Sequence, residues 1–128
     1  IEKLSPEMCG IGPFVPHKDT KFKNENHGDV SLVLMLLSII RLLKPNILLP
    51  ATTALGTVDP LGREKGILHG ANVVMPNLSP VKHRKDYSLY DNKICTGDEA
   101  AQCIGCLADR MKKIGYEIVT DRGNYTEK

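Results

Sequence analysis

The feature that most constrains the fold of this chain is its alternation of short apolar segments with longer helical patterns. Residues 7–9, 47–49 and 71–75 are short, largely apolar runs, each followed closely by glycine, proline or threonine. Such runs between chain breakers are typical of strands that are buried on both faces. Helical patterns separate them over residues 30–43 and 60–69. Because strands that alternate with helices pair in parallel through right-handed crossovers, the sequence predicts an α/β fold.

The first helix is expected to begin after Asp29, whose carboxylate suits an N-cap, and to end before Pro45. Its sequence is strongly apolar, but Ser31, Ser38 and Arg41 interrupt it. The run is also shorter than the roughly 18 residues that a membrane span needs. We therefore predict a buried helix and no membrane partner.

The second helix has boundary signals of its own. Asp59 and Pro60 form a favourable N-cap and N1 pair, and Gly70 suits the end of the helix before the third strand. The charged residues expected on its solvent side are Arg63, Glu64 and Lys65.

Composition places the chain among ordinary single domains. It has 128 residues, of which 41% are hydrophobic and 25% charged, and its formal net charge is +2. Basic residues are scattered and aromatic residues are few, so we expect no nucleic-acid partner. Nothing in the sequence resembles a signal peptide, and the composition is not that of a disulfide scaffold. A reducing, cytoplasmic location is predicted.

The ends of the three predicted strands carry unusual sequence. They comprise Met8 to Gly12, the pair Thr52 and Thr53, and Met75 to Asn77. Two folds are compatible with these strand–helix units, a (β/α)8 barrel and an open doubly wound sheet. In a barrel the carboxyl ends of all strands face one common site. A complete barrel has eight strands and about 250 residues, so the three strands predicted here would supply less than half of one. The absence of a full dinucleotide fingerprint argues against a Rossmann site.

Two of these strand ends have chemistry suited to a ligand. The hydroxyl groups of Thr52 and Thr53 can donate to an anion or a carboxylate, and a turn containing Gly10 and Gly12 lets backbone approach a ligand closely. Each feature also has an ordinary structural interpretation, because threonine pairs commonly end strands and glycines commonly form turns. Their combination at one edge favours a site.

Three cysteines have the spacing of metal ligands. Cys95 precedes a predicted helix that Thr96 and Glu99 would cap, and Cys103 and Cys106 lie one turn apart within that helix. Three thiolates suit an iron–sulfur cluster or zinc. The alternative is that they are small apolar residues of a helix, as buried cysteines often are.

Four long motifs, at residues 9–20 (CGIGPFVPHKDT), 49–57 (LPATTALGT), 70–80 (GANVVMPNLSP) and 90–98 (YDNKICTGD), resemble the HydE-type maturases of FeFe-hydrogenase. That family belongs to the radical S-adenosylmethionine (radical SAM) enzymes and is related to biotin synthase. The resemblance implies an α/β fold, namely the C-terminal part of a TIM-type (β/α)8 barrel with about its last three β/α units.

The resemblance also implies a division of the chain. Residues 1–94 would form the last strands and helices of the radical SAM barrel. Residues 95–128 would form an iron–sulfur-binding helical segment, part of the region associated with biotin and thiamin synthesis.

Site residues follow from the resemblance where positions match. The residues implied to line the cavity for S-adenosylmethionine and substrate are Met8, Thr52, Thr53, Met75, Tyr87 and Tyr90. The turn beside the cofactor would consist of Gly10, Gly12 and Pro13. The ligands of an accessory iron–sulfur cluster, either 2Fe-2S or 4Fe-4S, would be Cys95, Cys103 and Cys106. No residue of the chain is assigned as a catalytic acid or base.

One element of the family pattern is absent. The Cys-x3-Cys-x2-Cys loop that holds the catalytic 4Fe-4S cluster does not occur in this sequence. The resemblance therefore implies an enzyme as the parent protein, and this chain alone is predicted to be inactive. The implied partners are a small-molecule or organometallic substrate, the missing N-terminal half of the barrel and other hydrogenase maturases.

Two further interpretations stay open from the sequence. The chain could be a stand-alone iron–sulfur or metal-binding module without catalysis, in which case chelation would unfold it. It could instead be an engineered or proteolytic half-barrel that dimerises, or docks with its missing half, through an exposed sheet edge.

Overall fold

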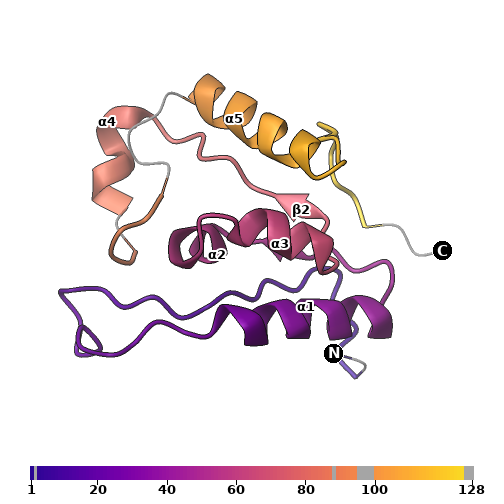
Figure 1. Ribbon diagram of the computed structural model, residues 1–128, viewed down its shortest axis with the longest axis horizontal. Helices are drawn as coiled ribbons and strands as arrows, with labels where there is room; N and C mark the ends of the chain where they lie inside the picture. Colours follow the sequence, from indigo (N-terminus) through magenta and orange to yellow (C-terminus); the bar gives the residue numbers. More distant parts are fainter. Residues whose placement is uncertain (2, 88, 95–99, 126–128) are drawn as a thin grey trace.

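The computed structural model describes residues 1, 3–87, 89–94 and 100–125 (Figure 1). In chain order its elements are α1 (Val30–Leu43), β1 (Pro50–Ala51), α2 (Thr53–Val58), α3 (Gly62–Leu68), β2 (Val73–Val74), α4 (Val81–Arg84), the 3-10 helix η1 (Lys85–Tyr87) and α5 (Ala100–Lys113).

Three extended segments run in parallel, as predicted. Met8 forms a parallel bridge with Leu48, and β1 pairs with β2 in the register Pro50 to Val73. The strands are shorter than the sequence indicates. One reason is that the side chain of Asn72 accepts the Leu49 N–H at 2.8 Å, which takes the place of a ladder bond before β1. The parallel α/β arrangement is thus confirmed for the described part of the chain, whereas a closed barrel stays a prediction.

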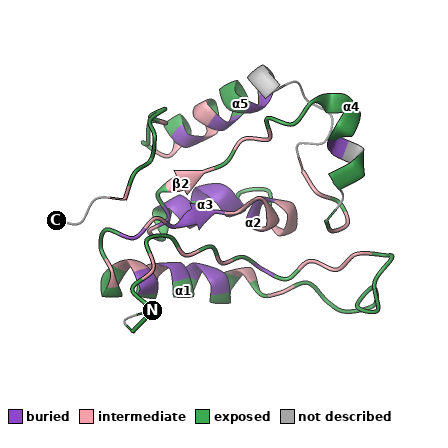
Figure 2. Ribbon diagram, turned by 180° about the vertical axis from the view of Figure 1, so that it is seen from behind, coloured by how far each residue is buried: buried purple, intermediate pink, exposed green. Residues whose placement is uncertain are grey.

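The helices form a row beside the sheet. Figures 1 and 2 show α3 between α1 and α5. The helix α3 contacts both α1 and β1. A single apolar cluster joins all of them, and its buried members are Val33, Leu34, Leu37, Ile40, Ile47, Leu49, Ala51, Leu55, Ile67, Ala71, Leu107 and Met111. The cysteine-bearing helix therefore shares its core with the strands.

The predicted boundaries of the first helix are confirmed. Asp29 is the N-cap of α1 and accepts a hydrogen bond from the Ser31 N–H at 2.7 Å. Lys44 is the C-cap, directly before Pro45. Among the described helices, none combines the length and the apolar character that a bilayer crossing requires.

The predictions for α3 need correction. The helix begins at Gly62 with Leu61 as N-cap, because Asp59 and Pro60 form a turn in which the Asp59 carboxylate accepts the Leu61 N–H at 2.9 Å. Arg63 and Glu64 are not on a solvent face, since they are only 3% and 6% exposed. The packing of α5 and of the segment near residue 94 over α3 covers them.

Candidate functional site: the strand ends and the cysteine helix

The carboxyl ends of the three parallel segments meet at one edge of the sheet. Because Met8 pairs with Leu48, and Pro50 with Val73, the residues that follow each strand lie on the same side. The predicted second strand is wrong in one respect, because it ends at Ala51 and does not include the threonines. Thr52 is the N-cap of α2 and accepts the Leu55 N–H at 3.3 Å, and Thr53 begins that helix.

The glycine-rich turn meets the threonines. A Cβ atom on Gly12 would lie 2.6 Å from the Thr52 hydroxyl oxygen, so any larger residue would require the Thr52 side chain to move. Pro13, the next residue, is buried. By contrast, a Cβ atom on Gly10 would contact nothing within 4 Å. The structure thus brings Gly12 and Thr52 together, and it gives no packing reason for Gly10.

A small cavity of about 150 Å³ lies at the same edge. It unites two predicted site residues, Thr53 and Met75, although their sequence positions are far apart. The residues that line it are Thr53, Arg63, Met75, Pro76, Asn77, Lys93 and Ile94. Two cationic side chains and an amide beside a threonine hydroxyl suit an anionic or carboxylate group.

Sequence reasoning missed the cationic members of this cavity. Arg63 was expected in solvent and Lys93 was not singled out. Arg63 follows Gly62, where a Cβ atom would lie 2.2 Å from the Leu55 carbonyl oxygen. Gly62 at the start of α3 was therefore the sequence signal that α2 and α3 pack closely at the position of Arg63.

Other predicted cavity residues do not line this space. Met8 is half exposed, Tyr87 is 64% exposed in η1, and Tyr90 is half-buried. Their role as cavity residues stays a prediction.

The cysteine site is described in part. Cys95 lies outside the described residues, as do the predicted capping residues Thr96 and Glu99. On α5, Cys103 is buried and Cys106 is exposed. The described residues contain no group of three cysteine, histidine or acidic side chains arranged for a metal. The three-thiol site therefore also stays a prediction.

Gly105 lies on the same helix, between Cys103 and Cys106. A Cβ atom there would meet nothing within 4 Å, so no described neighbour requires the glycine. The surface beside Cys106 is open. Cys9, the remaining cysteine, is half-buried and packs against the core.

An ion pair attaches α5 to α3. The Arg110 guanidinium donates through Nε and Nη2 to the two carboxylate oxygens of Glu64, and the Nη2 distance is 2.6 Å. Burial alone would raise the pKa of Glu64. The hydrogen bonds from Arg110 and from the Glu64 backbone, together with the charges of Arg110 and Arg63, outweigh burial and leave this pKa below its ordinary value. The carboxylate is therefore ionised at neutral pH and fixes the position of the cysteine helix.

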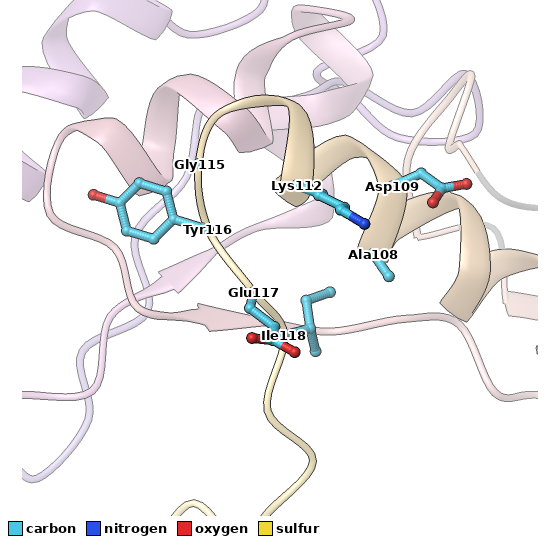
Figure 3. A pocket seen from close by; sticks show the side chains of 7 residues that line it. All are labelled: Ala108, Asp109, Lys112, Gly115, Tyr116, Glu117 and Ile118. Carbon is cyan, nitrogen blue, oxygen red and sulfur yellow. The ribbon is translucent and has the colours of Figure 1, made fainter.

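A larger hollow of about 620 Å³ lies between α5 and the segment that follows it (Figure 3). Its lining residues are Ala108, Asp109, Lys112, Gly115, Tyr116, Glu117 and Ile118. None of them is a predicted site residue, and the hollow mixes charges of both signs. It offers no convergent chemistry of the kind found at the strand ends.

These features accompany a sequence similarity to the HydE-type maturases, and the resemblance predicted from the motifs is confirmed. The HydE maturase subunit of FeFe hydrogenase from Thermotoga maritima is 44% identical over 117 residues, which cover 91% of this chain. The chain spans about a third of the length of that relative, 34%. No protein-family profile matches the chain.

Proposed function

We propose that this chain is the C-terminal part of a radical SAM enzyme of the HydE type, which helps to assemble the active-site cofactor of FeFe-hydrogenase. The observation that carries the proposal is the 44% identity with a HydE maturase along nearly all of this chain. The parallel strands with site residues at one edge support it. We infer a cytoplasmic location and interaction with other hydrogenase maturases in the same way.

The strand-end edge would form one wall of the barrel cavity. Thr53, Arg63 and Lys93 would hold an anionic or carboxylate group of S-adenosylmethionine or of the substrate by hydrogen bonds and charge. Met75 and the tyrosines at positions 87 and 90 would help to exclude water from a reactive radical. With its catalytic 4Fe-4S cluster, S-adenosylmethionine would supply radical chemistry in the complete enzyme, whereas these residues bind and orient.

The cysteine helix would hold an accessory iron–sulfur cluster. Thiolates are the preferred ligands of such clusters, and Cys103 and Cys106 lie one turn apart on α5, with Cys103 buried and Cys106 exposed. Cys95 would complete the set. The donor chemistry fits a 2Fe-2S or 4Fe-4S cluster near the molecular surface.

The alternative is a stand-alone iron–sulfur module without catalysis. In such a module the cysteine segment would fold around its metal, independently of the strands. Leu107 and Met111 of α5 instead belong to the same apolar core as the strands. This shared core supports the first proposal.

A chimaera tests the proposed function. The matched segment of Thermotoga maritima HydE would be replaced by this chain, and the product assayed for hydrogenase activation in a reconstituted maturation reaction. We expect activation above that of HydE lacking the segment, and its loss in a chimaera carrying Thr52→Val and Thr53→Val. A chimaera that folds and binds iron but activates no better than the deletion would contradict the proposal.

A further inference from the structure

The helix α1 carries an apolar surface that neither the strand-end cavity nor the cysteine helix uses. One face of α1 is buried in the core through Val33, Leu34, Leu37 and Ile40. The opposite side, which we term the outer face, exposes Leu32, Met35, Leu36, Ile39, Leu42 and Leu43. In Figure 2 the buried residues of α1 appear in purple and the exposed ones in green.

The outer face has no charged residue. The single charged side chain of α1, Arg41, is half-buried and bonds the Gly70 and Pro45 carbonyl oxygens instead. A helix that is apolar on all sides is typical of one buried on all sides. Contiguous apolar surfaces of this kind mark interaction sites in soluble proteins. We therefore expect another apolar surface to pack against the outer face.

The position of α1 indicates what covers it. Spatial order follows chain order, since the Met8 segment, β1 and β2 are successive neighbours and α1, α3 and α5 lie in a row. The outer face and the outer edge of the Met8 segment therefore adjoin the place of a preceding strand–helix unit. The relative is about three times as long as the matched region, so a HydE-type protein contains the additional chain for such a unit.

We infer that the outer face of α1 is the docking surface for an apolar helix from the other two thirds of a HydE-type protein. This inference rests on the proposed function. The chain would contact the rest of a HydE-type protein through helix packing on α1, in addition to any pairing of strands at the sheet edge.

Co-expression tests the inference. The chain would be produced together with a tagged polypeptide that comprises the residues of Thermotoga maritima HydE outside the matched segment. We expect a one-to-one complex, and Met35→Glu or Ile39→Glu should weaken it by about tenfold or more, because each places an unpaired charge in an apolar contact. The matched control is Leu61→Glu, which changes an apolar residue outside α1 that is at least as exposed as Met35 and Ile39, and it should leave binding unchanged.

Hydrogen exchange provides a second readout that does not depend on the variants. Peptides from α1 should gain protection in the complex, whereas the exposed segment around residues 18–26 should not. Equal binding by Ile39→Glu and the wild type, with no added protection of α1, would overturn the inference.

Three further outcomes would also overturn it. The first is concentration-dependent self-association of the chain that Ile39→Glu abolishes, which would make a second copy of the chain the occupant. The second is flotation of the chain with phosphatidylglycerol vesicles that depends on Ile39. The third is failure of the wild-type chain to bind the complementary polypeptide. Hydrogenase activation by the chimaera is scored separately, so failure of this surface and failure of the proposed function are distinguishable.

Discussion

At the scale of single residues, buried charge determines how the helices are held together. Glu64 was expected in solvent, yet the structure pairs it with Arg110 from a helix that lies 46 positions later in the chain. Arg110 also donates to the Pro60 carbonyl oxygen. The Arg110 side chain therefore connects the cysteine helix to α3 and to the turn before it.

We predict that Glu64→Gln destabilises the chain by about 2 kcal/mol at pH 7, since it leaves the partly buried guanidinium of Arg110 without its counter-charge. The folded-state pKa of Glu64 is below its ordinary value, so its contribution is fully present above that value. The contribution is lost as the pH falls through the lowered pKa. Urea unfolding of both proteins from pH 7 to pH 3 should thus show two stability curves that converge at low pH.

Glu25→Gln is the control, because Glu25 is exposed and lies in a loop. Asp59 should contribute acid sensitivity to both proteins, because the hydrogen bond from Lys65 and that from the Leu61 backbone lower its pKa. A constant difference between wild type and Glu64→Gln down to pH 3 would contradict the assigned ion pair.

At the scale of elements, two glycines of helical segments have opposite roles. Gly70 has φ of +101° after the end of α3, and a Cβ atom there would lie 2.8 Å from the Cβ of Arg41. Gly105 lies within α5 and has open space around it. We predict that Gly70→Ala lowers the free energy of unfolding by about 2 kcal/mol, whereas Gly105→Ala raises it by about 0.5 kcal/mol. Thermal unfolding would measure the change in stability of each variant. Equal changes in the two variants would contradict the different roles assigned to Gly70 and Gly105.

The helix α5 also provides the prediction for metal binding. Anaerobic reconstitution with iron and sulfide should load the chain with a cluster that electron paramagnetic resonance detects after reduction. We expect replacement of Cys95, Cys103 and Cys106 by serine to remove this cluster, because serine lacks the soft sulfur ligand. Cys9→Ser, the control at the core, should retain it. Equal iron content in the triple variant would place the cluster elsewhere or exclude it.

At the scale of the whole molecule, the shared core makes the cysteine helix part of one folding unit. Met111 of α5 is buried within the cluster that also contains residues of α1, β1 and α3. We predict that Met111→Ala costs about 3 kcal/mol and shifts the transitions of all probes together. Ile104→Ala, at an exposed position of the same helix, is the control. Separate transitions for α5 and for the strands would show two independent units.

The sequence by itself predicted the parallel strand order, the extent of α1 and its Asp29 cap, because these depend on residue periodicity and on local hydrogen bonds. It also determined the similarity to the HydE-type maturases, since the motifs are long and ordered. It did not predict that Arg63 and Glu64 are buried. Periodicity within one helix cannot indicate what packs over it from distant parts of the chain.

Tertiary structure decided which residues share a site. Thr53 and Met75 meet in one cavity because parallel strands end at the same edge, and Arg63 and Lys93 join them through the packing of α3 and of the segment after η1. Gly12 meets Thr52 for the same reason. Such contacts join residues dozens of positions apart, and local propensities carry no information about that distance. The sequence thus determined α1, the parallel strand order and the family resemblance, whereas tertiary packing determined which charges are buried and which side chains converge.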